Sequence, residues 1–169
     1  MRWIMRVLAL ALGTLLSGCF ASDRPMFSPA SAIPALGNGG RYATFEVDEG
    51  KEKPSDPIVV RPGPANVYDF VNEKGHATPV TFHPIAGGLH VAQVSLDGGQ
   101  GYGYVVARVA GHEVTIMPAE CARQDKAKMD ALGVVQVNPY ECRIDRVADP
   151  AAFFAGLSFS PAVSRMVRE

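Results

Sequence analysis

Three histidines recur at seven-residue intervals, at His76, His83 and His90, and imidazole nitrogens are frequent ligands for metal ions. The hairpin predicted below places His83 and His90 on opposite faces of a sheet, where they cannot share an ion. The dipeptide His112-Glu113 lacks the second histidine that zinc motifs place at a fixed spacing. We therefore predict structural or surface histidines, with no metal site and no cofactor.

The three cysteines suggest two other kinds of chemistry, which are acylation of a thiol and oxidation to a disulfide. Cys19 stands just after an apolar stretch of ten residues, 7–16, which follows Arg2 and Arg6. Ten apolar residues are too few to span the ~30 Å of membrane hydrocarbon. A basic start, a short apolar run and small residues behind it are typical of a signal peptide.

The tetrapeptide Leu16-Ser17-Gly18-Cys19 resembles a bacterial lipobox. The resemblance implies removal of a signal peptide, residues 1–18, and acylation of both the Cys19 thiol and the new N-terminus. Two or more acyl chains anchor a protein stably, so the membrane is an expected partner. Phe20 is not the aspartate that this family links to inner-membrane retention, which favours the outer membrane, facing the periplasm. An ordinary secretory signal with a chance cysteine is the alternative.

Cys121 and Cys142 remain once Cys19 is acylated, and oxidising conditions outside the inner membrane favour a disulfide between them. The bond would tie a helix to a late strand, and a chain-entropy model gives it about 3 kcal/mol. A redox pair is the alternative, because a cysteine near a helix start can have a lowered pKa. No Cys-x-x-Cys motif supports that alternative, so we predict a structural bond.

A glycine-rich stretch, residues 98–104, contains Tyr102 and Tyr104. Phosphate-binding loops join a strand to a helix N-terminus, whereas this stretch joins two predicted strands, so we predict a hairpin loop. The two tyrosines lie on the sheet face opposite Val105. There they offer a stacking surface for a sugar or an aromatic ligand, unless a helix or a neighbouring strand covers them.

No nucleophile elbow and no Ser-x-x-Lys motif is present, so we predict no catalytic residues and no enzymatic activity. A glycan- or peptidoglycan-acting enzyme is the alternative, because a pair of catalytic carboxylates cannot be recognised without geometry. Two of the 16 Lys and Arg residues lie in the predicted signal peptide. The mature chain would therefore have 14 basic residues and 17 acidic residues. This balance predicts no basic surface for nucleic acid.

The elements that carry these residues are mostly strands. Ala86-Gly87-Gly88 signals a hairpin between strands 78–85 and 89–96. A two-residue loop would leave both faces mixed, whereas a three-residue loop pairs Ile85 with Leu89 and separates apolar from polar residues. We predict the three-residue loop, with one apolar face made of Val80, Phe82, Ala92, Val94 and Leu96.

A second hairpin joins strands 102–109 and 112–117 through Ala110-Gly111. This register also gives one apolar face, and it sets Arg108 opposite Glu113. The predicted apolar pairs are Ala107 with Val114 and Val105 with Ile116. Two consecutive hairpins of this kind predict an antiparallel meander.

Further strands are expected at 42–47, 58–60, 67–71, 134–137 and 142–147. The charged stretch 48–57 is expected to be a solvated loop. Residues 119–132 are expected to form a medium helix, and 151–157 a short helix that Asp149 and Pro150 begin. Ser160-Pro161 is a candidate start for a last helical turn.

The predicted organisation is a signal peptide (1–18), a flexible tether (19–39) and a single antiparallel β-rich domain (40–169). Scattered apolar residues in the tether could instead dock on the domain or the membrane. The fold class is mainly β (α+β), with a meander that forms a curled sheet or small barrel, one medium helix and a short C-terminal helix. We expect a lipid-anchored envelope module that binds an envelope protein or the cell wall. The alternative is a lipocalin-like carrier of a small apolar ligand, a likeness of strand pattern only.

Overall fold

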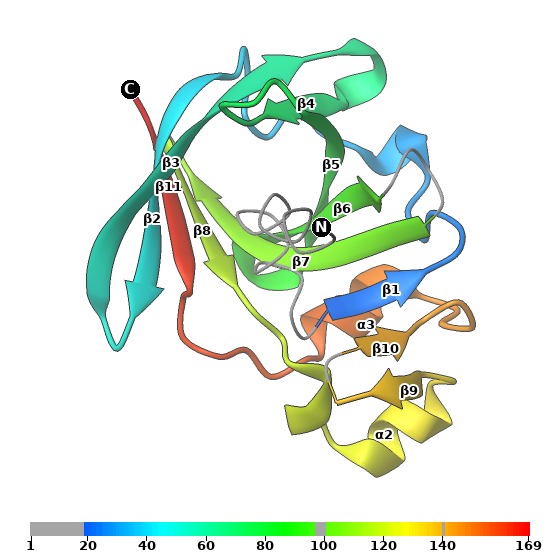
Figure 1. Cartoon of the computed structure of the whole chain (residues 1–169). Coiled ribbons are helices and arrows are strands. Elements are labelled where there is room, and N and C mark those ends of the chain that lie inside the picture. Colours follow the sequence, from blue (N-terminus) through cyan, green and yellow to red (C-terminus); the bar gives the residue numbers. More distant parts are fainter. Residues whose placement is uncertain (1–18, 97–100, 140) are drawn as a thin grey trace, which may run out of the picture.

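The computed structural model describes residues 19–96, 101–139 and 141–169. Within these ranges eight strands close into an antiparallel barrel, because β6 pairs with β7 and β11 pairs with both β8 and β2 (Figure 1). The barrel strands are β2 (Gly40–Asp48), β3 (Lys51–Pro62), β4 (Tyr68–Val71), β5 (Ala77–Ile85), β6 (Leu89–Leu96), β7 (Gly101–Ala110), β8 (Glu113–Met117) and β11 (Ser164–Arg168). The expected mainly β fold with a small barrel is confirmed.

The hairpin between β5 and β6 has the predicted register. Ile85 pairs with Leu89, Phe82 with Ala92, and Val80 with Val94, around a three-residue loop. Gly87 and Gly88 both have positive φ there. The alternation of apolar and polar residues therefore sufficed to fix this pairing.

The register predicted between β7 and β8 is wrong by two residues. Ala107 pairs with Ile116 and Arg108 with Thr115, so Arg108 does not face Glu113. The turn consists of Gly111-His112, with Gly111 at φ +59°. A primed hairpin turn needs a positive φ at its first central residue. Glycine adopts that conformation more easily than alanine, so the turn begins at Gly111 and not, as predicted, at Ala110. A shift of two residues keeps the same side chains on each face.

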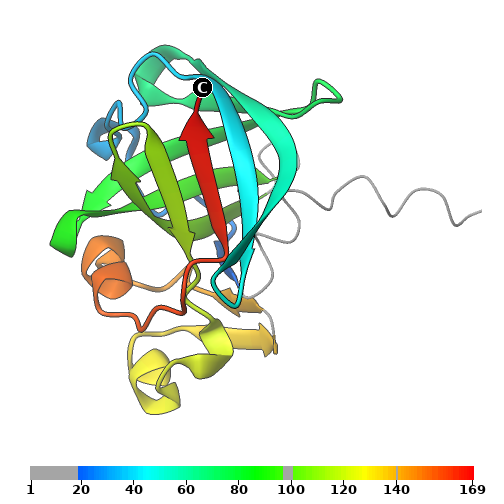
Figure 2. The same ribbon diagram turned by 90° about the vertical axis from the view of Figure 1, so that its left-hand side faces the viewer.

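A second layer lies outside the barrel. It consists of β1 (Cys19–Ser22), β9 (Val135–Asn138), β10 (Glu141–Arg143), α2 (Lys126–Ala131) and α3 (Pro150–Ala155). The first half of β7 pairs with β1, which carries β10 and β9 in turn. Figure 2 shows this layer below the barrel, at the end of the molecule opposite the C-terminus. Its core packs α3 and β1 against outward-facing side chains of β6 and β7.

The predicted flexible tether is wrong for the residues after Cys19. Phe20, Phe27 and Leu36 are each at most 6% exposed, and Ile33 bridges to Phe82 on the free edge of β5. Burying a phenylalanine contributes about 1.5–3 kcal/mol, which offsets part of the entropy lost when this segment becomes ordered. The structure shows the alternative instead, because these apolar residues pack against the domain.

Three further elements differ from expectation. The charged stretch 48–57 continues β2 and β3 as a hairpin, whose Glu49-Gly50 turn has positive φ at both residues. The expected medium helix is a single 3-10 turn, Cys121–Arg123, followed by the short α2. Asp125 separates them, because its carboxylate accepts the backbone N–H of Lys128 as an N-cap. The expected last helical turn is the strand β11.

Candidate functional site: the barrel interior

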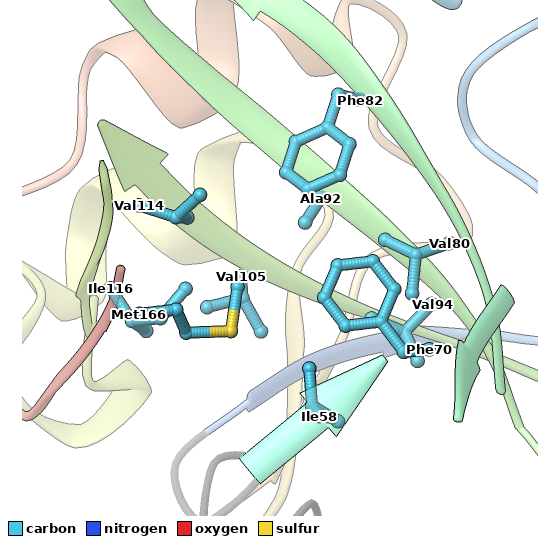
Figure 3. A pocket seen from close by; sticks show the side chains of 10 residues that line it. All are labelled: Ile58, Phe70, Val80, Phe82, Ala92, Val94, Val105, Val114, Ile116 and Met166. Atoms are coloured by element: carbon cyan, nitrogen blue, oxygen red, sulfur yellow. The ribbon is translucent and has the colours of Figure 1, made fainter. Parts of the chain in front are cut away.

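The barrel interior contains a cavity of about 70 Å³. Side chains alternate between the two faces of a strand, so each of the seven strands at this level contributes one or two of them to the inside. All the lining residues are apolar, as Figure 3 shows; they are Ile58, Phe70, Val80, Phe82, Ala92, Val94, Val105, Val114, Ile116 and Met166.

This lining determines what the cavity can hold. It offers no hydrogen bond, and cavities of that kind stay free of water but accept small apolar guests. Pockets for drug-sized ligands measure about 300–1,000 Å³, so this one has room for a single narrow apolar group. Met166 forms part of the wall, and the unbranched methionine side chain can move to enlarge the space.

One end of the barrel is closed by the segment that precedes β2. Leu36 packs among Tyr42, Val60 and Tyr68, and the Tyr68 hydroxyl donates to the carbonyl oxygen of Gly37 at 3.1 Å. The same hydroxyl accepts the backbone N–H of Leu36 at 3.2 Å. This segment can approach β3 only through Gly39, since a Cβ there would lie 2.2 Å from the carbonyl oxygen of Val60. The closing segment is therefore fixed to the wall of the barrel.

The other end carries polar side chains. Met166 pairs with Thr44, and Ser164, the next inward residue of β11, pairs with Glu46. Glu46 in turn pairs with Lys53 on β3, so these residues continue the inner face beyond the cavity. Glu46 and Lys53 are exposed. An amphipathic ligand could thus hold its apolar end inside and its polar end in this mouth.

The tyrosines predicted as a ligand surface do not form one. Tyr104 points outward, as expected, but it is only 2% exposed beneath the N-terminal segment. Its hydroxyl contacts Ser22 Oγ at 2.6 Å and accepts the backbone N–H of Met26 at 3.0 Å. Burial raises the pKa of the Tyr104 phenol. Tyr102 is partly buried against the same core. The neighbouring strand β1 and the N-terminal segment therefore cover this face, which is the alternative stated above.

The two histidines of the β5–β6 hairpin lie on opposite faces, as predicted. His83 points outward and is 1% exposed, with its ring stacked on Phe27 at 4.6 Å. Its nitrogens contact Ser31 Oγ at 2.9 Å and Thr81 Oγ1 at 2.8 Å. Burial lowers the pKa of His83 to about 4, so this side chain is a neutral structural group at pH 7.

His90 shares the inner face with Ala92 and pairs with Ala107. Its Nδ1 is buried, and among the described residues it has no hydrogen-bond partner. Burial lowers the pKa of His90 as well, which keeps the interior uncharged. Among the residues that the structure describes, no group of three potential metal ligands lies together.

Cys121 and Cys142 form a disulfide with Cα atoms 6.0 Å apart. The bond joins the 3-10 turn to β10 in the outer core, and it fits an extracytoplasmic location. Cys19 is the first residue of β1. The predicted signal peptide, residues 1–18, and residues 98–100 of the glycine-rich stretch lie outside the described residues.

Sequence reasoning found most of the cavity wall but missed Met166, Phe70 and Ile58. Met166 lies in the stretch after Ser160-Pro161 that was expected to be helical, and the sequence of β11, Ser-Arg-Met-Val-Arg, does not alternate apolar and charged residues. No strand period therefore marked Met166 as an inward residue. Phe70 and Ile58 lie in strands that were expected, but too short to reveal which face is inward.

No helix in the described part of the chain is both long enough and apolar enough to cross a bilayer. Comparison with known proteins finds no matching family model, no matching curated protein and no matching solved structure. The β-barrel fold is compatible with a lipocalin-like carrier.

Proposed function

We propose that this protein is a non-enzymatic, lipid-anchored envelope protein whose barrel binds the apolar end of a small amphipathic ligand. The observation that carries the proposal is the cavity, which lies between a closed end and a polar mouth and is lined by apolar side chains alone. Its size suits the end of an acyl chain better than a bulky ring system. The polar part of the ligand would lie near Thr44, Glu46 and Lys53.

A titration with a fluorescent fatty acid, parinaric acid, tests this proposal. The lipid-free chain 19–169 with Cys19→Ser is suitable, since the described residues from β1 onward pack as one unit. We expect saturable binding to this protein. Ala92→Leu adds three carbon atoms inside the cavity and should weaken binding at least about tenfold, because the guest and the new side chain need the same space.

Ala110→Leu is the matched control, because Ala110 is exposed at the end of β7. It should bind like the parent. If Ala92→Leu does not fold, Ala92→Val makes a smaller change of the same kind. Equal affinity in the parent and in a folded Ala92 variant would show that the barrel interior is not the binding site.

The anchor belongs to the same proposal and has its own test. The lipobox at Leu16-Ser17-Gly18-Cys19 supports acylation of Cys19. Cys19→Ala should abolish labelling by a fatty-acid analogue and release the protein from membranes. Persistent labelling of that variant would contradict the anchor while leaving the cavity proposal intact.

A binding module for an envelope protein or the cell wall is the second candidate. The outer edge of β9 favours it, since this strand pairs with β10 on one side and its four residues are exposed. An exposed strand edge can pair with a strand of another protein. Photo-crosslinking from Gln136 in intact cells tests this candidate, which predicts one specific crosslinked protein.

A further inference from the structure

Exposed large apolar side chains are concentrated in one short stretch of the described chain, residues 132–137. Leu132, Val135 and Val137 are 39%, 50% and 58% exposed, and they follow one another between the end of α2 and β9. In the described residues Val163 is the other large apolar side chain with comparable exposure. Such a cluster marks a contact with another molecule or with a membrane.

The position of this cluster relative to Cys19 indicates its occupant. β1 begins at Cys19 and pairs with β10, and β10 pairs with β9. Neighbouring strands lie about 4.8 Å apart, so the backbone of β9 lies about 10 Å from that of β1. Because β1 begins at Cys19 itself, no flexible segment separates an acylated Cys19 from this sheet.

An acylated Cys19 would hold the start of β1 at the surface of a bilayer. The polar layer of a bilayer is about 5–8 Å thick on each side of its hydrocarbon core. Side chains of β9 would therefore lie within reach of the boundary between head groups and acyl chains. Apolar side chains gain most from that boundary, which gives a physical reason for the exposure of two valines on an outermost strand.

We propose that Leu132, Val135 and Val137 contact the lipid bilayer beside the anchor, and that this contact fixes the orientation of the domain. The proposal rests on the acylation of Cys19 proposed above. The end of the barrel that holds the C-terminus would then point away from the membrane. Figures 1 and 2 both show the C-terminus and the β9–α2 region at opposite ends of the molecule.

A single-cysteine label on the complete, processed protein tests the contact. Cys121 and Cys142 are joined and Cys19 would be acylated, so Val137→Cys supplies one free thiol for a fluorophore. The labelled protein is reconstituted into vesicles of phosphatidylethanolamine and phosphatidylglycerol that contain brominated acyl chains. We expect the label to lose most of its fluorescence, because bromine quenches it over short distances.

Ala110→Cys is the control. Ala110 lies beside the β7–β8 turn, where the backbone N–H of Arg168 donates to the carbonyl oxygen of His112, so it is near the C-terminus. Its label should keep its fluorescence. Val135→Cys provides a second position on the cluster if Val137→Cys disturbs β9.

Mass spectrometry of the same samples separates the two proposals. A chain without acyl groups would overturn both the anchor and the bilayer contact. An acylated chain whose labels at Val137 and Val135 are no more quenched than the label at Ala110 would overturn the bilayer contact and leave the anchor standing. The same result together with a specific protein crosslink from Gln136 would assign this edge to a protein partner.

Discussion

His83 shows how one buried side chain connects two segments that are distant in the sequence. Its ring stacks on Phe27, and its nitrogens contact Ser31 from the N-terminal segment and Thr81 from β5. A neutral imidazole can donate from one nitrogen and accept at the other, which suits two hydroxyl partners. A charged ring would lose solvation here without gaining a carboxylate.

This environment predicts a pH dependence of stability. The pKa of His83 is lowered by burial from 6.5 to about 4 in the folded protein, so the unfolded chain binds more protons between these values. The free energy of unfolding should therefore decrease as the pH falls from about 6.5 to about 4, by up to about 3 kcal/mol from this residue.

Thermal unfolding at several pH values measures this effect, with His83→Gln as the comparison. The variant should be less stable at pH 7 and should show a weaker pH dependence across the same window. The same slope in the parent and in the variant would contradict the assignment to His83.

Among the elements, the segment before β2 differs most from what the sequence predicts. Phe20, Phe27 and Leu36 are spaced without any helical or strand period, so nothing local identifies them as core residues. Their partners are distant in the chain, such as Tyr104 and Phe154 around Phe27. The β5–β6 hairpin was predictable because its strands alternate regularly, whereas the β7–β8 register depended on the conformation of Gly111.

Phe27→Ala tests whether the N-terminal segment is part of the fold. Its side chain is 6% exposed, so the substitution should cost about 3–5 kcal/mol of unfolding free energy. Phe45→Ala removes the same group from a half-buried position beside Arg165 and should cost less. A flexible tether would instead make Phe27→Ala nearly neutral in chemical denaturation.

The disulfide is the second testable element. Cys121→Ser should lower the melting temperature, with a loss of about 3 kcal/mol in the chain-entropy account for a separation of 21 residues. The variant with both cysteines replaced by serine should resemble it, because either change removes the same bond. A reductant should destabilise the parent but not this double variant. Two free thiols in denatured, unreduced parent protein would contradict the bond.

At the scale of the whole molecule, the chain combines an apolar-lined barrel, an outer layer and, at the start of β1, the cysteine that we propose is acylated. The segment before β2 closes one end of the barrel, and the end that carries Glu46 and Lys53 is the polar one. The strand alternation predicted much of this interior from the sequence. The cavity itself could not be predicted, because its volume depends on how side chains from seven strands meet.

Methyl-resolved NMR of the lipid-free chain 19–169 with Cys19→Ser, titrated with dodecanoate below its micelle concentration, tests the central claim most directly. The account predicts saturable shifts of the methyl signals of Val80, Val94, Val105 and Ile116, which line the cavity. The signals of Val135 and Val137 should shift little, since these exposed valines report non-specific contact. Shifts confined to the exposed valines, or no saturable shift in the cavity, would contradict a barrel that binds an apolar ligand.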